Sequence, residues 1–373
     1  MQKRPIQFSL SELAGSLGDF GTLLPLAFGY STVCGLAPAG FLVMMGLANV
    51  LSGLVYRLPM PIEPMKALAV VAIAQQWSPS MVYASGLGMG IVWLLLATTG
   101  AITWIARATP KPVVMGIQVT LGILIATEAV KLASASWLLA LAGIVIVLTL
   151  RKNKYAPAAI VLVGAGLLVM LVSGGFQDLG PVEFRLPEFT SFTAREVWET
   201  LLLAGFAQVP LTAANAVIAT SALINSYWPD VEVTPRRLAY SHGVMNTIAP
   251  FLGGMPMCHG AGGLVGQYFY GARTAGANLI EGAIEITLGL FFAGSIAALF
   301  AAFPQAIVGA MMFMVGLELV KFVRHVKAAR DWAVVAVTVV VALLTNMAFG
   351  FIAGVLAHRL LILVGRRPEA TVQ

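Results

Sequence analysis

Two short segments of this 373-residue chain place prolines, glycines and polar side chains inside otherwise apolar sequence. The first, Leu58–Lys66, reads LPMPIEPMK, and the second, Gly253–Gly263, reads GGMPMCHGAGG. If a helix begins at the end of each segment, its first turn presents backbone N–H groups without intrahelical partners and the positive end of the helix dipole. Glycines let an anion approach the backbone closely, and Lys66 would add a full positive charge. Together the two segments predict an anion-binding site.

Polar side chains elsewhere in the chain could complete this site. The hydroxyl groups of Ser16 and Thr22 can donate hydrogen bonds to an anion, as can the amide of Gln208, while His259 can donate or titrate. The expected anion contacts are Ser16, Thr22, Met65, Lys66, Ala67, Gln208, His259, Gly260, Ala261, Gly262 and Gly263. A structural interpretation stays open for each, because small and polar residues also pack helices together and hydroxyl groups bond to their own helix.

Two carboxyl groups lie close in sequence to these positions. Asp19 is deep inside the first apolar segment, and Glu63 precedes Lys66 by three residues. An ionisable group in such surroundings is a functional candidate, so either carboxyl group could carry a coupling proton. Either could instead form a structural ion pair with Lys66. Both interpretations remain open from the sequence.

The sequence argues against an enzyme. Cys34 and Cys258 lie far apart in apolar surroundings, which indicates neither a disulfide framework nor a metal site. Paired aspartates, a Ser–His arrangement and a histidine-rich cluster do not recur on the apolar segments. We therefore expect no catalytic residues, no metal and no cofactor.

The composition defines which elements must position the candidate residues. Hydrophobic residues make up 59% of the chain and charged residues 10%, whereas a soluble domain carries about 25% charged residues. Apolar blocks of about 20 residues, separated by short polar joints, are typical of membrane-spanning helices. The net charge of +6 does not indicate a nucleic-acid partner, because the basic residues gather at the ends of these blocks. The expected surroundings are a lipid bilayer.

The pattern predicts an all-α polytopic membrane protein with fourteen segments. Their approximate limits are residues 11–31, 38–56, 60–76, 81–105, 112–132, 136–150, 156–173, 196–225, 238–253, 257–271, 277–302, 304–322, 332–347 and 350–365. The longest polar stretch, 174–195, separates a first half, 1–173, from a second half, 196–373. With the N-terminus in the cytoplasm, most Lys and Arg residues fall at cytoplasmic ends. We expect both termini in the cytoplasm, the 174–195 connector outside the cytoplasm, the cytoplasmic membrane as the location, and no cleavable signal peptide.

The two halves resemble each other weakly. A Met-Pro pair followed by an apolar residue occurs at Met60 and again at Met255, 195 residues later. The stretch Thr127–Leu132 (TEAVKL) also resembles Leu317–Phe322 (LELVKF). Since seven is an odd number, a repeat of seven segments places its second copy upside down in the membrane. Interrupted, Gly- and Pro-marked segments at matching positions of inverted repeats indicate a secondary transporter. We therefore expect two inverted repeats of seven, with segments 3 and 10 broken.

Three motifs carry a resemblance to a known family: Glu12–Thr22 (ELAGSLGDFGT), Pro59–Ala67 (PMPIEPMKA) and Met255–Leu264 (MPMCHGAGGL). They are similar to the signatures of the molybdate transporter family related to the sulfate permeases. The resemblance implies the seven-plus-seven inverted-repeat fold shared with nucleobase carriers, with the substrate held by segments 1, 3, 8 and 10. It also implies molybdate as substrate, with tungstate or sulfate as neighbours, and it allows a homodimer. Unlike most sulfate permeases, the chain is expected to carry no regulatory domain after its last segment.

The residues and the resemblance together predict a secondary active transporter that works by alternating access. Segments 1–4 and 8–11 would form a core that moves against a gate of segments 5–7 and 12–14. Uptake of a dianion against a negative interior potential needs coupling, which we expect from a proton on Asp19 or Glu63. A nucleobase–proton symporter stays open as the alternative, although Gln208 stands where an acid would bond a base. The small number of polar residues disfavours a passive anion channel.

Overall fold

The computed structural model describes residues 5–18, 20–150, 158–175 and 181–365. The first half of the chain forms α1 (Leu10–Ser16), α2 (Phe20–Thr32), α3 (Pro38–Tyr56), β1 (Glu63–Pro64), α4 (Lys66–Ala74), α5 (Pro79–Thr99), α6 (Ile102–Ala108), α7 (Lys111–Ala133), α8 (Trp137–Leu150) and α9 (Ala158–Ser173). The described part of the chain is therefore helical over most of its length, and its strands are very short.

The second half begins with a long continuous helical stretch in which π-helical turns alternate with α-helix. Its elements are α10 (Ala194–Thr200), η1 (Leu201–Gly205), α11 (Phe206–Thr212), η2 (Ala213–Ile218), α12 (Ala219–Tyr227), α13 (Pro235–Ile248), η3 (Ala249–Leu252), β2 (Met257–Cys258), α14 (Ala261–Tyr270), α15 (Gly276–Phe291), α16 (Ala293–Ala302), α17 (Gln305–Val320), η4 (Lys321–His325), α18 (Ala329–Leu344) and α19 (Met347–Gly365). Here η1 and η2 are π-helical, whereas η3 and η4 are 3-10 turns.

Several helices have the length and the apolar character that crossing a membrane requires. Within the described residues, four helices meet this requirement alone: Pro38–Tyr56, Pro79–Thr99, Lys111–Ala133 and Ala194–Tyr227. The pair α15 and α16 is bent by 87° at a short break, and together these helices would form a fifth. Shorter apolar helices lie at Trp137–Leu150, Val161–Ser173, Gln305–Val320 and Met347–Leu363. The protein is thus a helical integral membrane protein, as its composition predicts.

Three of the predicted segments are divided in the structure. The segment predicted at 11–31 forms two helices, because α1 ends at Ser16 and α2 begins at Phe20. The segment predicted at 81–105 ends early, since Gly100 adopts a φ of +72° and α6 follows as a separate helix. Glycine adopts this left-handed conformation at little cost and commonly ends helices. The segment predicted at 277–302 bends between α15 and α16.

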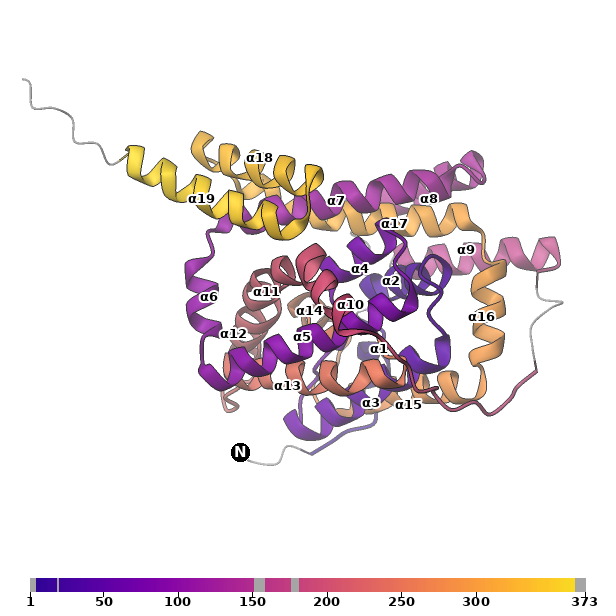
Figure 1. The fold of residues 1–373 in the computed structure, drawn as a ribbon. Helices are drawn as coiled ribbons and strands as arrows, with labels where there is room; N and C mark the ends of the chain where they lie inside the picture. Colours follow the sequence, from indigo (N-terminus) through magenta and orange to yellow (C-terminus); the bar gives the residue numbers. More distant parts are fainter. Residues whose placement is uncertain (1–4, 19, 151–157, 176–180, 366–373) are drawn as a thin grey trace, which may run out of the picture.

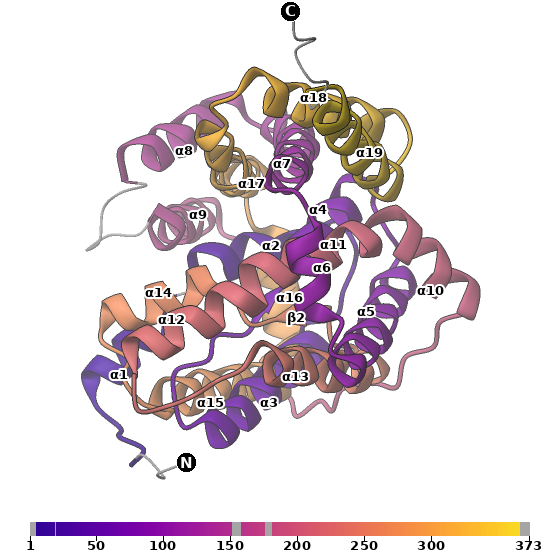
Figure 2. The same ribbon diagram turned by 90° about the vertical axis from the view of Figure 1, so that its left-hand side faces the viewer.

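The helices form two layers, which Figures 1 and 2 show from two directions. The upper layer in these views contains α7, α8, α9, α17, α18 and α19, and the lower layer contains α1 to α5 and α10 to α15. The helices α6 and α16 run between the two layers on opposite sides of the molecule (Figure 1). Each layer therefore combines elements from both halves of the sequence.

The same pattern of helix contacts between the two halves occurs twice, with the halves exchanged. Helix α3 packs along α15, and α13 packs along α5. Likewise α1 packs on α15 and α10 on α5, while α7 contacts α18 and α17 contacts α8. Every one of these contacts joins an element of the first half to an element of the second. The two halves are interleaved, so neither half forms its core alone.

Two glutamates near the ends of the lower layer attach helices to each other. The Glu12 carboxylate on α1 accepts hydrogen bonds from the backbone N–H groups of Thr274 (2.9 Å) and Ala277 (3.1 Å) at the start of α15. On α10, Glu196 accepts a hydrogen bond from the Ser80 hydroxyl group at the start of α5. An anionic side chain at a helix start satisfies unpaired N–H groups and interacts favourably with the helix dipole.

Candidate functional site

The strands β1 and β2 pair antiparallel at the centre of the lower layer. Glu63 lies opposite Cys258 and Pro64 lies opposite Met257, and the Met65 N–H group donates to the Pro256 carbonyl at 2.9 Å. Helix α4 begins directly after β1, and α14 begins shortly after β2. Because the strands are antiparallel, the two helices leave the small sheet in opposite directions with their N-terminal ends toward it. The two helix starts that the sequence singles out are thus brought together.

Prolines and two buried asparagines hold these segments extended. A residue before proline is restricted to extended conformations, which applies to Met60, Glu63 and Met255. The Asn278 side chain accepts from the Met60 N–H group at 2.7 Å and donates to the Met60 carbonyl at 2.6 Å. Asn246 makes the same pair of bonds with Met257, at 2.8 and 2.7 Å. Each amide takes the place of a neighbouring strand, so the backbone polar groups are satisfied although no further strand pairs with them.

Sequence reasoning missed Asn246 and Asn278. Both side chains are fully buried. The only signal was an amide side chain inside an apolar segment, which is also typical of ordinary helix packing.

Lys66 and Glu63 form an ion pair beside the paired strands. The Lys66 Nζ atom lies 3.0 Å from Glu63 Oε2, and the lysine side chain is 33% exposed whereas the glutamate side chain is 1% exposed. A Cβ atom on Gly260, the N-cap residue of α14, would lie 2.1 Å from Glu63 Oε2. The carboxylate therefore packs against the start of α14. The Lys66 side chain is partly exposed and the Glu63 side chain is buried.

Gln208 caps the start of α4. Its Oε1 atom accepts hydrogen bonds from the N–H groups of Ala67 (2.7 Å) and Leu68 (3.2 Å), and its Nε2 group donates to the Thr212 hydroxyl group. Two of the N–H groups that a helix start leaves unpaired are thereby satisfied within the protein. Gln208 lies at the predicted site, but here it turns its carbonyl oxygen toward α4. The Ala67 N–H group is occupied in this conformation.

The start of α14 is more open than the start of α4. Gly260 and Gly263 are buried, Ala261 is partly exposed and Gly262 is exposed. Apart from its chain neighbours and the backbone of its own helix, no described atom lies within 4 Å of the position that a Cβ atom on Gly262 would take. A small anion would find space beside the backbone there.

His259 uses its polar groups within the protein. Its Nδ1 atom lies 3.2 Å from the Pro61 carbonyl oxygen, which can only accept, so Nδ1 carries the proton. Its ring Nε2 atom lies 2.8 Å from the Ser241 hydroxyl oxygen. The backbone N–H group of His259 donates to His242 Nε2 at 2.8 Å. His259 therefore links the two broken segments directly.

The remaining predicted residues lie on the first apolar segment. Ser16 is fully buried at the end of α1, and its hydroxyl group donates to the Leu13 carbonyl at 2.8 Å. Asp19 lies outside the described residues. Thr22 is part of α2, but its side chain is not among those described. Among the described residues, no three His, Cys, Asp or Glu side chains gather around a point that could hold a metal ion.

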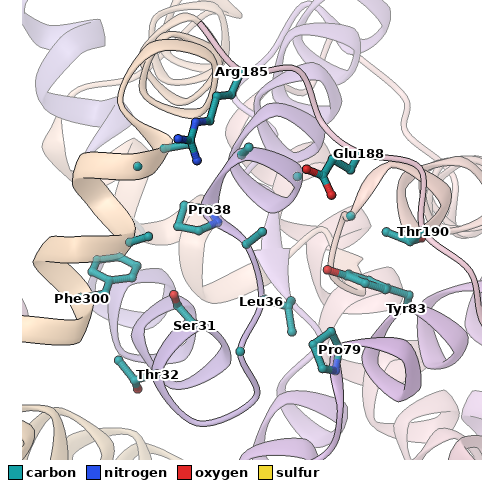
Figure 3. A pocket seen from close by; sticks show the side chains of 18 of the residues that line it. Ser31, Thr32, Leu36, Pro38, Pro79, Tyr83, Arg185, Glu188, Thr190 and Phe300 are labelled. Carbon is teal, nitrogen blue, oxygen red and sulfur yellow. The ribbon is translucent and has the colours of Figure 1, made fainter. Parts of the chain in front are cut away.

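A large cavity lies away from this site. It has a volume of about 1090 Å³ and is lined by residues of the connector, the loop between α2 and α3, the start of α5 and the helix α16. Figure 3 shows Arg185 and Glu188 of the connector at its rim, with Tyr83 and Phe300 among the other residues lining it. Lys66 and the glycines of α14 do not line this cavity.

Solved structures of two transporters share this fold. It resembles the transmembrane domain of the cyanobacterial bicarbonate transporter BicA with a TM-score of 0.69 at 18% identity, covering 94% of this chain and 97% of that chain. It also resembles the murine anion transporter Slc26a9 in an inward-facing state with a TM-score of 0.75 at 12% identity, covering 97% of this chain and 69% of that one. At these identities the likeness shows a shared fold.

The family follows from the sequence itself. Residues 11–125 and 200–319 match the family described as "Molybdate transporter of MFS superfamily". Molybdate transporter 2 of Arabidopsis thaliana is 30% identical over 94% of this chain and 87% of its own length. Molybdate transporter 1 of Chlamydomonas reinhardtii is 30% identical over 93% of this chain and 90% of its own length. The chain belongs to this molybdate transporter family, which confirms the resemblance seen in its motifs.

Proposed function

We propose that the protein is a secondary active transporter of molybdate that works by alternating access, with tungstate or sulfate as further substrates. One observation carries this proposal: the pairing of β1 with β2 sets two helix starts against each other beside a partly exposed lysine. Helix starts and a lysine are the groups that bind a tetrahedral dianion. Family membership supports molybdate as that dianion.

In this proposal the predicted residues have different parts. Lys66 supplies the positive charge, and the backbone around Gly262 supplies the open N–H groups of α14. Gln208 and His259 hold the two helix starts in place, and they reach the substrate directly only if their present hydrogen bonds rearrange. Ser16, Thr22, Met65, Ala67, Gly260, Ala261 and Gly263 complete the proposed binding region.

We also propose that the chain contains fourteen segments in two inverted repeats, with segments 3 and 10 broken at β1–α4 and β2–α14. The recurrence of helix contacts between halves supports this proposal, as does the placement of α6 and α16 on opposite sides. The lower layer would be the moving core and the upper layer the gate. With both termini in the cytoplasm, the 1090 Å³ cavity beside the connector opens outside the cytoplasm.

Uptake of a dianion needs an energy source. Each negative charge moved inward costs about 2.3 kcal/mol per 100 mV of interior-negative potential. A co-transported proton offsets part of this cost. The candidate carriers remain Asp19 and Glu63.

Calorimetry on the purified protein with molybdate, sulfate and uracil tests the proposed substrate. Molybdate should bind, uracil should not, and Lys66→Ala should weaken molybdate binding by about 10- to 150-fold, since a hydrogen bond to a charged group contributes about 1.5–3 kcal/mol. Lys131→Ala is the matched control, because Lys131 also pairs with a buried glutamate three residues earlier, at 3.0 Å. This control should bind molybdate normally.

Two outcomes would contradict the proposal. Uracil binding without oxyanion binding would indicate the nucleobase symporter. Molybdate flux through proteoliposomes that never saturates and shows no counterflow would indicate a channel.

A further inference from the structure

We infer that Glu63 is the proton-binding site of the transport cycle, and that it acts by competing with the substrate for Lys66. The inference rests on the proposed function and names the group that couples protons to it. In the substrate-free protein the Glu63 carboxylate takes the position of an anion beside Lys66 and the start of α14. When a dianion binds, Glu63 accepts a proton and releases the lysine.

The carboxylate of Glu63 lies where an anionic substrate would be drawn. Its Oε2 atom is 3.0 Å from Lys66 Nζ, and its position against Gly260 puts it at the N-cap of α14. Its Oε1 atom is buried and has no hydrogen-bond partner among the described residues. A buried carboxylate oxygen without a donor is costly. A proton on the carboxyl group lowers this cost.

The Glu63 carboxylate and a bound dianion would repel each other strongly if both lay beside Lys66. The ion pair of Lys66 and Glu63 is neutral as a unit, so a dianion that arrives beside it would add two uncompensated negative charges in a largely buried site. Like charges this close favour protonation of one of them, which is the behaviour of paired carboxylates. The neutral carboxylic acid no longer holds Lys66, and the lysine is then free for the dianion.

The other ionisable groups around Glu63 leave it as the group that responds. Cys258 lies opposite Glu63 on β2, and both Cys258 and Tyr30 on α2 are buried in this apolar core. His259 on the same segment has both ring nitrogens engaged, with Ser241 and Pro61. Glu318 on α17 interacts electrostatically with Lys66, but its side chain is 55% exposed and is paired with Lys321.

Other buried glutamates are held in different ways. Glu12 accepts three backbone N–H bonds, from Arg273, Thr274 and Ala277. Glu128 is paired with Lys131 near the C-terminal end of α7. Among the described glutamates, Glu63 is the one that lies at the paired strands and contacts the cation of the site.

The proton balance of the cycle follows directly. One O–H bond forms on Glu63 as the dianion binds on the outer side, and the same bond breaks as the dianion leaves on the inner side. One proton thus accompanies each dianion, and the charge carried per cycle falls from −2 to −1. Because a proton is bound together with the dianion, molybdate affinity should fall about tenfold for each unit rise in pH.

The test measures proton uptake when molybdate binds to the purified full-length protein in weak buffer, together with molybdate affinity between pH 6 and pH 8. We expect the wild type to take up about one proton per molybdate and to lose affinity about tenfold per pH unit. Glu63→Gln should bind molybdate with no proton uptake and no pH dependence. The matched control Glu128→Gln removes a carboxylate with the same 3.0 Å, i,i+3 lysine contact and should behave as the wild type.

Each result separates this inference from the proposed function. If the wild type binds no molybdate, the proposed function fails. If the wild type binds molybdate without proton uptake, or if Glu63→Gln retains both the uptake and the pH dependence, the role of Glu63 is wrong and the transporter assignment stands.

An infrared difference spectrum gives a second readout that does not depend on Glu63→Gln folding. Molybdate binding to the wild type should produce a carboxylic-acid C=O band. Glu63→Asp, which keeps the carboxyl group, should shift this band. Absence of the band, or an unchanged band in Glu63→Asp, would overturn the inference.

Discussion

Replacing Gly260 with alanine probes the contact between the two broken segments most directly. The added Cβ atom would lie 2.1 Å from Oε2, 2.3 Å from Cδ and 2.7 Å from Oε1 of Glu63. All three distances are shorter than any real Cβ contact, so the carboxylate must move or the strands must separate. Overpacking of this kind costs about 1–3 kcal/mol. We expect Gly260→Ala to lower the free energy of unfolding by that amount.

A double-mutant cycle tests whether the clash with Glu63 is the cause. In a Glu63→Ala background the carboxylate is gone, so Gly260→Ala should then cost less than about 0.5 kcal/mol, the limit within which independent changes add. The assay is equilibrium unfolding of the purified protein in mixed micelles, followed by tryptophan fluorescence. The comparison uses four proteins: the wild type, the two single variants and the double variant.

Gly262→Ala is the control for the loss of a glycine near the start of α14. Apart from the chain neighbours and the backbone of the same helix, no described atom lies within 4 Å of its Cβ position, and alanine in a helix is favoured over glycine by up to about 1 kcal/mol. This variant should therefore be neutral or slightly more stable. Equal destabilisation by Gly260→Ala and Gly262→Ala would refute the reasoning, as would a Gly260→Ala effect that persists in the Glu63→Ala background.

Three further predictions concern the capping of α4, the hydrogen bonds of Asn246 and Asn278 to the extended segments, and the orientation in the membrane. Gln208→Leu leaves the N–H groups of Ala67 and Leu68 without their acceptor, and should lower the free energy of unfolding by about 1–3 kcal/mol; a loss below 0.5 kcal/mol would contradict the cap. Asn278→Leu removes two hydrogen bonds to the Met60 backbone, and Asn246→Leu removes two to Met257 and one to the His242 carbonyl. Both variants should lower the free energy of unfolding by similar amounts in the same assay; a large effect of only one would show that the two asparagines are not equivalent. In intact cells, a membrane-impermeant thiol reagent should label Phe189→Cys but not Glu232→Cys, because the proposed topology puts the connector outside the cytoplasm and the segment before α13 inside it. Both positions are exposed on the protein, and the native Cys34 and Cys258 are buried. The reverse labelling would invert the proposed topology.

The sequence was most informative where polar residues interrupt apolar segments. The two interrupted segments are the places where the structure has its short strands, and the i,i+3 spacing of Glu63 and Lys66 already allowed the ion pair that is observed. Local spacing predicts such features because they depend on residues close together in the chain.

Contacts between distant residues could not be predicted in the same way. The bond from His259 to Pro61 spans 198 positions, and the bond from Ala67 to Gln208 spans 141. Which oxygen or nitrogen of Gln208 faces α4 depends on how α11 packs in three dimensions. The bend between α15 and α16 also lacked a signal, because the apolar residues around Phe292 read as a continuous span.

The direct bonds between the two broken segments have a consequence for any cycle of alternating access. The Met65 N–H group and the His259 ring donate hydrogen bonds to the carbonyls of Pro256 and Pro61, and the strands β1 and β2 pair with each other. Parting the two helix starts to admit or release an ion would break all of these bonds inside an apolar interior. If the protein works by alternating access as proposed, the two helix starts would therefore move together as one rigid unit. The ion would then change sides as this unit slides or rocks past the upper layer, with the same binding geometry on both sides of the membrane.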